Sequence, residues 1–224
     1  NAKVDRPPPG TPIYCAIDFS KAFDVTSLCY GWWIDGKFHV KWHHWAIRDP
    51  HVEGVKRHYQ RFVENWARHD NVTICTHQVQ YDLVKQKLDE LRTWGEVKRI
   101  GYDALGGMKT EVQAWGDIDD RYNPETDLPM WSMPQTIMVM GPSTYLAESY
   151  IRHKNLVLDE DLVVEYALAN VQLEKNINGD RRPCKLKSMG IIDPVVAFVM
   201  LCGVLIREGA ERPGAYSDLG NIAC

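Results

Sequence analysis

Three strand-like segments that follow one another directly restrict the fold of this chain more than any other feature of its sequence. Segments 13–19, 26–34 and 37–45 are rich in β-branched, aromatic and other apolar residues, as strands are. Asp35-Gly36, between the second and the third segment, is a dipeptide typical of two-residue hairpin turns. The first part of the chain is therefore predicted to form a three-stranded meander.

Beyond the meander, helical and strand-like patterns alternate. Apolar residues recur at helical spacing in 51–68 and 78–94. The other predicted elements are strands at 71–75, 97–103 and 135–140, helices at 143–153, 159–169 and 193–207, and a hairpin with arms at 171–176 and 182–187. A meander followed by alternating helices and strands is typical of the α/β class, with a mixed β-sheet flanked by α-helices.

Three aspartates stand where predicted buried elements end or begin. Asp18 and Asp103 each close a short apolar run, and Asp193 opens the apolar helix predicted at 193–207. Each aspartate alone also fits a helix cap or a solvated loop. Together, three carboxylates would repel one another unless cations lay between them, so the set indicates a divalent-metal site. Asp24 is a fourth candidate ligand, and a role in the turn before the second strand is equally open for it.

A basic hairpin precedes the third aspartate. Its turn contains Asn178-Gly179, and its positive charges outnumber Glu174 and Asp180. Such a ribbon can lie along a phosphate backbone, or it can be an ordinary charged hairpin, and the sequence leaves both interpretations open. The candidate DNA-contacting residues are Lys175, Arg181, Arg182, Lys185, Lys187 and Ser188.

Composition narrows the classes of function. Among 224 residues, 26 Lys and Arg stand against 30 Asp and Glu, a net charge of −4. This charge argues against a free-standing, non-specific DNA-binding protein, but not against a metal nuclease, since bound cations restore a positive potential where phosphate enters. No apolar run reaches the length of about 18 residues that a membrane span needs. The six cysteines form no Cys-x-x-Cys pair and the histidines lack zinc-site spacing, so buried, reduced thiols are expected.

Several short motifs, taken in order, resemble those of one known family. They are Cys15-Ala-Ile-Asp18-Phe-Ser20 with Asp24-Val-Thr26, Ile100-Gly-Tyr-Asp103, Met140-Gly-Pro-Ser-Thr144-Tyr-Leu146, Leu168-Ala-Asn170-Val171, and Lys185-Leu-Lys-Ser188 leading to Ile192-Asp193. Their order and spacing over 13–207 are similar to those of the C-terminal nuclease domain of tailed-phage terminase large subunits. Ala104-Leu105-Gly106 departs from the Pro-Trp that often follows the second aspartate in that family, which affects the pocket wall and leaves the ligand in place. The resemblance implies a ribonuclease H-like α/β fold.

The resemblance also implies an endodeoxyribonuclease that cuts concatemeric viral DNA during genome packaging. Asp18, Asp103 and Asp193 would hold two Mg²⁺ or Mn²⁺ ions for phosphodiester hydrolysis, with Asp18 shared between the ions. Residues 1–12 would be a linker from an N-terminal ATPase domain, 13–209 the nuclease domain and 210–224 a C-terminal tail. The implied partners are double-stranded DNA, the portal protein and the small terminase subunit, in the cytoplasm of a phage-infected bacterium and without a membrane.

Two other classes of function fit the same residues. Another ribonuclease H-like nuclease, such as a resolvase or an integrase core, would use similar carboxylates, and a dimeric state with preference for DNA junctions would favour it. A non-catalytic module that docks on the portal or on the small terminase subunit would require no cleavage at all. Metal-dependent nicking of plasmid DNA separates this docking module from either enzyme.

Overall fold

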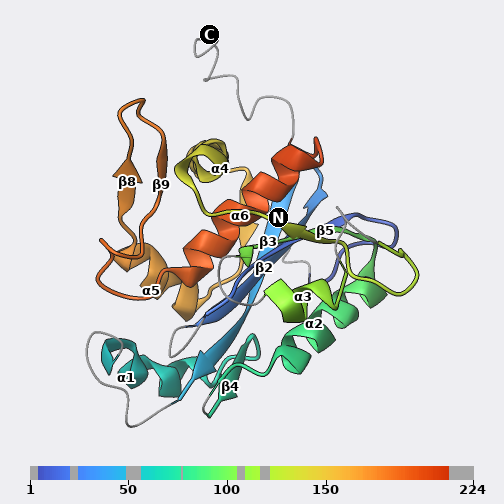
Figure 1. Ribbon diagram of the computed structural model, residues 1–224, viewed down its shortest axis with the longest axis horizontal. Coiled ribbons are helices and arrows are strands. Elements are labelled where there is room, and N and C mark those ends of the chain that lie inside the picture. The colour runs from blue at the N-terminus through green and yellow to red at the C-terminus, as the bar shows by residue number, and fades with distance from the viewer. Residues whose placement is uncertain are drawn as a thin grey trace.

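A mixed β-sheet forms the centre of the computed structural model (Figure 1). The described residues are 5–20, 25–48, 57–76, 78–104, 109–116 and 122–211. Across these ranges the sheet has seven strands in the order β4-β3-β2-β1-β5-β6, with β7 also paired to β3. The strand bounds are β1 Ile13–Asp18, β2 Thr26–Ile34, β3 Lys37–Ile47, β4 Val72–Cys75, β5 Val97–Tyr102, β6 Met130–Ser132 and β7 Leu156–Leu158.

The first three strands form the predicted meander. β1 pairs with β2, and β2 with β3, in antiparallel register. Asp35 (φ 47°) and Gly36 (φ 78°) make the connecting turn in the left-handed conformation that two-residue hairpin turns of this kind require. β5 and then β6 continue the sheet on the other side of β1 with parallel pairing. The prediction of a mixed sheet is therefore confirmed, and β1 lies inside it with a partner strand on each side.

Helices cover both faces of this sheet. Their bounds are α1 Arg57–Trp66, α2 Tyr81–Trp94, α3 Lys109–Gln113, α4 Ile137–Arg152, α5 Leu162–Asn170 and α6 Asp193–Arg207. α4, α5 and α6 lie on one face, and α2 and α3 lie on the other (Figure 1). Side chains along β1 alternate between the two, so that Ala16 packs on the α6 side and Ile17 on the α2 side. None of the helices in the described ranges is long and apolar enough to cross a membrane.

α6 packs across the strands β1, β2 and β5. It has the predicted bounds, with Asp193 as its first residue and Pro194 in its first turn, a position where the missing N–H of proline leaves no helical bond unmade. Gly203 allows a close approach to α4, because a Cβ at this position would lie 2.7 Å from the Oγ of Ser143. α6 is therefore held tightly between the sheet and α4.

The strand predicted at 135–140 is wrong, because α4 already begins at Ile137. A short apolar run followed by Gly141-Pro142 is typical of a strand that ends at a turn, whereas here Pro142 lies inside the helix. Pro142 cannot donate to the carbonyl of Met138, and Met138 is 84% exposed, so water can reach this part of the helix. The elements β6, β7 and α3 were not predicted either, because they are too short to show a period in the sequence.

The basic hairpin is confirmed, with shorter arms than predicted. β8 (Leu173–Lys175) and β9 (Arg181–Pro183) pair in antiparallel register, and Gly179 (φ 88°) lies in the segment that connects them. The hairpin is separate from the main sheet and contacts α4 through β9 (Figure 1). The chain runs from this hairpin directly to the start of α6, so the hairpin and Asp193 are connected by a short segment.

A buried hydrogen-bond network joins β2, β3 and α5 on the α6 side of the sheet. The Oγ of Ser27 lies 3.0 Å from Nδ1 of His44, and Nε2 of His44 lies 3.0 Å from Oδ2 of Asp161. Oδ1 of Asp161 accepts hydrogen bonds from the N–H groups of Val163 and Val164, which caps α5. The order Ser, His, Asp is that of a hydrolase triad, but Ser27 has no exposed surface for a substrate to reach. The network therefore stabilises the fold.

Replacing Asp161 by Ala is expected to lower the free energy of unfolding by about 3 kcal/mol at neutral pH, because a helix cap and a buried partner of His44 are lost together. Burial raises the pKa of Asp161, but the hydrogen bonds from His44 and from the amides of α5 outweigh it and hold the pKa below its usual range. A lowered pKa in the folded state stabilises above about pH 4, the usual pKa of Asp, and this stability is lost as the pH falls through the folded value. Urea unfolding at several pH values checks this prediction. The difference between wild type and Asp161→Ala should shrink in acid.

Asp159→Ala serves as the control for this prediction, since Asp159 makes a part-exposed ion pair with Lys41 in the same segment. It is expected to reduce the free energy of unfolding by about 1 kcal/mol or less. Equal losses for the two variants would contradict the role given to the buried network.

Candidate metal centre

The register of β1 and β5 places two of the predicted ligands side by side. Ile17 of β1 pairs with Tyr102 of β5 in parallel register, so Asp18 and Asp103 follow at the same edge of the sheet. Gly101 of β5 faces α6, since a Cβ there would lie 2.8 Å from a methyl carbon of Val204. Continued alternation puts Asp103 on the same side as Asp18. Asp103 is half-buried at this edge.

Lys185 connects Asp18 to the third predicted ligand, Asp193. Its Nζ lies 2.9 Å from Oδ2 of Asp18 and 2.7 Å from Oδ1 of Asp193. Both aspartates are 2% exposed, whereas the Lys185 side chain is 43% exposed and reaches the centre from outside. Two carboxylates from opposite ends of the sequence thus share a single positive charge.

Burial is the main electrostatic influence on Asp18. It raises the pKa of this carboxyl well above the usual range, the ammonium of Lys185 opposes the rise, and the neighbouring carboxyl of Asp193 adds to it. Burial also acts to lower the pKa of Lys185, but the two aspartates outweigh it and raise this pKa above its ordinary value. One cation is therefore shared by two buried carboxylates.

The oxygen atoms of Asp18 differ in their partners. Oδ1 accepts a hydrogen bond from Nε2 of Gln135 at 2.8 Å. Oδ2 is buried and accepts no hydrogen bond of good geometry, although the ammonium of Lys185 lies close enough for an ion pair. A buried carboxylate oxygen that accepts no hydrogen bond is a suitable ligand for a hard cation.

The donor set fits Mg²⁺ or Mn²⁺, which prefer carboxylate oxygens to nitrogen or sulfur. In the part of the chain that the structure describes, no three acidic, imidazole or thiol side chains are arranged to share one ion. The ammonium of Lys185 lies between Asp18 and Asp193, so a divalent ion bound by both would take its place. Asp24, the fourth candidate ligand, lies outside the described residues.

Sequence reasoning missed the contributions of Lys185 and Gln135 to this centre. Lys185 was predicted to contact DNA, and Gln135 was placed at the start of a strand that does not form. Lys185 precedes Asp193 by a short segment, but no motif signals that its side chain turns back between two aspartates. Both contacts depend on the packing of the hairpin and α4 against the sheet.

The basic residues of the hairpin have different surroundings. Arg181 pairs with Glu148 at 2.8 Å, and Arg182 pairs with Glu174 across the hairpin. Ser188 donates from its hydroxyl to the carbonyl of Cys184, which fixes the loop after β9. The remaining predicted DNA contacts, Lys175 and Lys187, are exposed and make no ion pair with the carboxylates of the described ranges.

Comparison with protein families identifies the class that this fold and site define. The model of the terminase large subunit, endonuclease domain, matches residues 6–208. This chain belongs to that family, whose nuclease domains have a ribonuclease H-like fold. A search of curated proteins found no match.

Solved structures of phage terminases share the fold. The large terminase of bacteriophage HK97 is 20% identical with a TM-score of 0.68, and the match covers 86% of this chain and 39% of that one. The large terminase nuclease of thermophilic phage G20c with bound magnesium is 11% identical with a TM-score of 0.55, over 89% of this chain and 84% of that one. The large terminase of a second thermophilic bacteriophage is 10% identical with a TM-score of 0.53, over 91% of this chain and 40% of that one. This chain thus spans less than half of the HK97 protein and less than half of the last one.

Proposed function

We propose that this chain is a metal-dependent DNA endonuclease that cuts concatemeric phage DNA during genome packaging. The observation that carries the proposal is the pair of buried carboxylates, Asp18 and Asp193, that share one cation beside Asp103 at the edge of the sheet. Membership of the terminase endonuclease family supports a nuclease, and a nuclease of similar fold from phage G20c was solved with bound magnesium. The same membership disfavours the resolvase and integrase alternatives.

In this proposal Asp18, Asp103 and Asp193 would hold two Mg²⁺ or Mn²⁺ ions, with Asp18 as the shared ligand. Such ions would activate the attacking water and stabilise the leaving oxygen. Gln135 would hold one oxygen of Asp18, and the other, which pairs with Lys185 in the absence of metal, would bind a metal ion. Asp193 lies in the first turn of α6, where the helix dipole favours a carboxylate. Lys185, which has a flexible stem and an exposed side, would turn from the aspartates toward the phosphate of the DNA.

The wider proposal concerns partners and context. The hairpin residues Lys175, Arg181, Arg182, Lys185, Lys187 and Ser188 would lie along double-stranded DNA. Residues 1–12 would connect to an ATPase domain, and the assembled motor would act with the portal protein and the small terminase subunit in the host cytoplasm. The tail proposed at 210–224 lies, beyond residue 211, outside the described residues. Held by such a motor, DNA is present at high effective concentration, so an acidic domain needs little affinity of its own.

Nicking of supercoiled plasmid tests the proposal against the docking module. The chain is expected to convert plasmid to nicked and linear forms with Mg²⁺ or Mn²⁺ and to be inactive with EDTA. Ca²⁺ should not support cleavage, because its looser coordination positions the attacking water poorly. Absence of cleavage with both Mg²⁺ and Mn²⁺ would contradict the nuclease and favour docking.

Replacing Lys175 and Lys187 together by Ala is expected to weaken binding to duplex DNA. The slope of log affinity against log salt should fall in magnitude by about 2, because two phosphate contacts are lost. Fluorescence anisotropy over a range of salt concentrations measures this slope. Lys85→Ala with Lys98→Ala removes the same charge from α2 and β5 and should leave the slope nearly unchanged. An unchanged slope for the hairpin variant would show that DNA binds elsewhere.

A further inference from the structure

Two tryptophan side chains hold the two ends of α6 to the sheet. Nε1 of Trp42, on β3, donates to the carbonyl of Pro194 in the first turn of α6 at 3.1 Å. Nε1 of Trp33, on β2, donates at 3.0 Å to the carbonyl of Ala210, just beyond the other end of the helix. The same type of bond, from an indole to a backbone carbonyl, therefore occurs at both ends, but only Trp42 reaches the residue that follows Asp193.

The close packing at Gly203 lies in the second half of α6, and the bond from Trp42 adds a directional restraint to its first turn. Most of α6 is apolar and buried against the sheet and α4. Hydrophobic burial is non-directional, so apolar contacts alone fix the orientation of a helix end less well than a hydrogen bond does. A hydrogen bond has a preferred length and angle and opposes shifts of the helix end. Because Asp193 lies in the first turn, these shifts would change its distance from Asp18.

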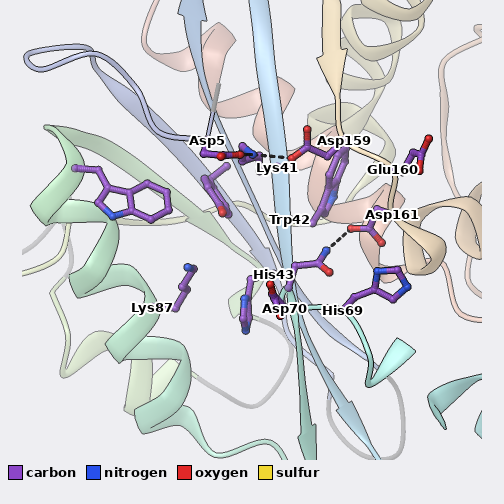
Figure 2. A pocket seen from close by; sticks show the side chains of 13 residues that line it. Asp5, Lys41, Trp42, His43, His69, Asp70, Lys87, Asp159, Glu160 and Asp161 are labelled. Atoms are coloured by element: carbon purple, nitrogen blue, oxygen red, sulfur yellow. Dashed lines mark hydrogen bonds and ion pairs between the residues drawn. The ribbon is translucent and has the colours of Figure 1, made fainter. Parts of the chain in front are cut away.

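Trp42 lies in an interval of β3 that has no partner strand at the edge of the sheet among the described residues, and its indole N–H donates to α6. β3 pairs with β7 through Val40 and with β4 from His44 onward, so the interval that contains Trp42 has no partner strand on this edge. Trp42 lines a cavity of about 390 Å³ there, together with Asp161 (Figure 2). Its ring packs on Phe198 of α6, with centroids 6.0 Å apart. The indole is thus fixed by the helix whose first turn it contacts.

The same strand also supports the other buried carboxylate. His44, two residues beyond Trp42 and on the same face of β3, pairs across the strands with Ser27. Ser27 in turn pairs directly with Asp18. Trp42 therefore contacts the segment that carries Asp193, whereas His44 reaches Asp18 only through Ser27 of β2. β3 is therefore connected to both aspartates, to Asp193 through Pro194 and to Asp18 through Ser27.

We infer that Trp42 is a positioning residue of the metal centre, which sets the placement of Asp193 through the carbonyl of Pro194 and so the affinity of the centre for divalent ions. The inference rests on the proposed function. Groups that orient metal ligands without touching the metal commonly change affinity by 10- to 100-fold when they are removed. Loss of the indole donor is expected to act at the lower end of this range.

The test compares Trp42→Phe with Trp33→Phe. Each variant keeps an aromatic ring and removes one indole donor to a carbonyl at one end of α6. Isothermal titration with Mn²⁺ measures the dissociation constant, and calorimetric melting without metal measures stability. We expect Trp42→Phe to bind Mn²⁺ about tenfold more weakly than wild type. Trp33→Phe should show a comparable loss of melting temperature and an affinity within about twofold of wild type.

A site-specific replacement of Trp42 by 3-benzothienylalanine serves if Trp42→Phe fails to fold, because it keeps the shape of the indole and lacks its N–H. The same loss of affinity is expected for it. Affinities equal to wild type for either folded Trp42 variant, or equal losses for the Trp33 control, would overturn the positioning role and leave the proposed function intact. Failure of wild type to bind Mn²⁺ would instead overturn the proposed function and this inference together.

Discussion

Asp18→Asn is expected to reduce metal-dependent cleavage of plasmid DNA by about a thousandfold, because a ligand that contributes several kcal/mol to charge stabilisation is lost. The substitution preserves the shape of the side chain, and the amide oxygen can still accept from Gln135. It removes the negative charge with which Asp18 pairs with Lys185 and would bind metal ions. Single-turnover cleavage in Mg²⁺ and in Mn²⁺ measures the effect.

The control for this loss of cleavage is Asp159→Asn, which also removes an aspartate from an ion pair with a lysine, in this case Lys41. Its cleavage rate should remain within about twofold of wild type, since Asp159 pairs with Lys41 and not with the residues of the proposed metal centre. A cleavage rate near wild type for Asp18→Asn would show that Asp18 is not the central ligand.

Without metal, the difference in melting temperature between wild type and Asp18→Asn is expected to depend on pH. Burial raises the pKa of Asp18 in the folded chain, so the folded state binds more protons than the unfolded state above about pH 4. The associated stability is present at low pH and is lost as the pH rises through the folded value. The melting temperature of wild type relative to Asp18→Asn should therefore fall as the pH is raised, and in neutral solution the variant should melt at or above the wild-type temperature.

Lys185→Ala is expected to raise the affinity for Mn²⁺ by at least about tenfold. An ammonium within 3 Å of Asp18 and Asp193 competes for the place that a divalent ion would occupy, and unit charges at such distances interact strongly even near a surface. The partial exposure of the lysine reduces this effect through solvent screening. Titration calorimetry of the metal-free chain measures the affinity.

Without metal, Lys185→Ala should melt at a lower temperature than wild type, because two buried carboxylates lose their shared cation. Added Mn²⁺ should then raise its melting temperature by more than that of wild type. Lys41→Ala, which breaks another lysine–aspartate pair, is the control and should leave Mn²⁺ affinity unchanged. A weaker affinity in Lys185→Ala would show that the lysine assists metal binding and does not compete with it.

The parts of the site that sequence could predict are those fixed by the ends of regular elements. Asp18 and Asp103 could be singled out because each closes an apolar run, and parallel pairing of β1 and β5 then brings such residues to one edge. The position of Asp193 could be predicted because an aspartate before a proline commonly opens a helix, and α6 begins there. The meander was equally accessible, since Asp35-Gly36 fixes its turn.

The parts that sequence could not predict depend on tertiary packing. The apolar run before Gly141-Pro142 has the pattern of a strand. Here it forms the start of α4, whose apolar residues pack on the α6 side of the sheet, and such tertiary packing overrides local preference. Lys185 and Trp42 illustrate the same limit for side chains. A lysine in a basic hairpin and a tryptophan in an apolar strand have ordinary local surroundings, and their contacts with Asp18, Asp193 and Pro194 come from segments far away in the chain.

A crystal of this chain soaked in Mn²⁺ tests the central claim most directly, since the anomalous signal of manganese locates the ions without reference to activity. The account predicts anomalous density between Asp18 and Asp193, with Asp103 as a further ligand and the ammonium of Lys185 turned away from both aspartates. Absence of density at these carboxylates, with Lys185 still between Asp18 and Asp193 at saturating Mn²⁺, would contradict it.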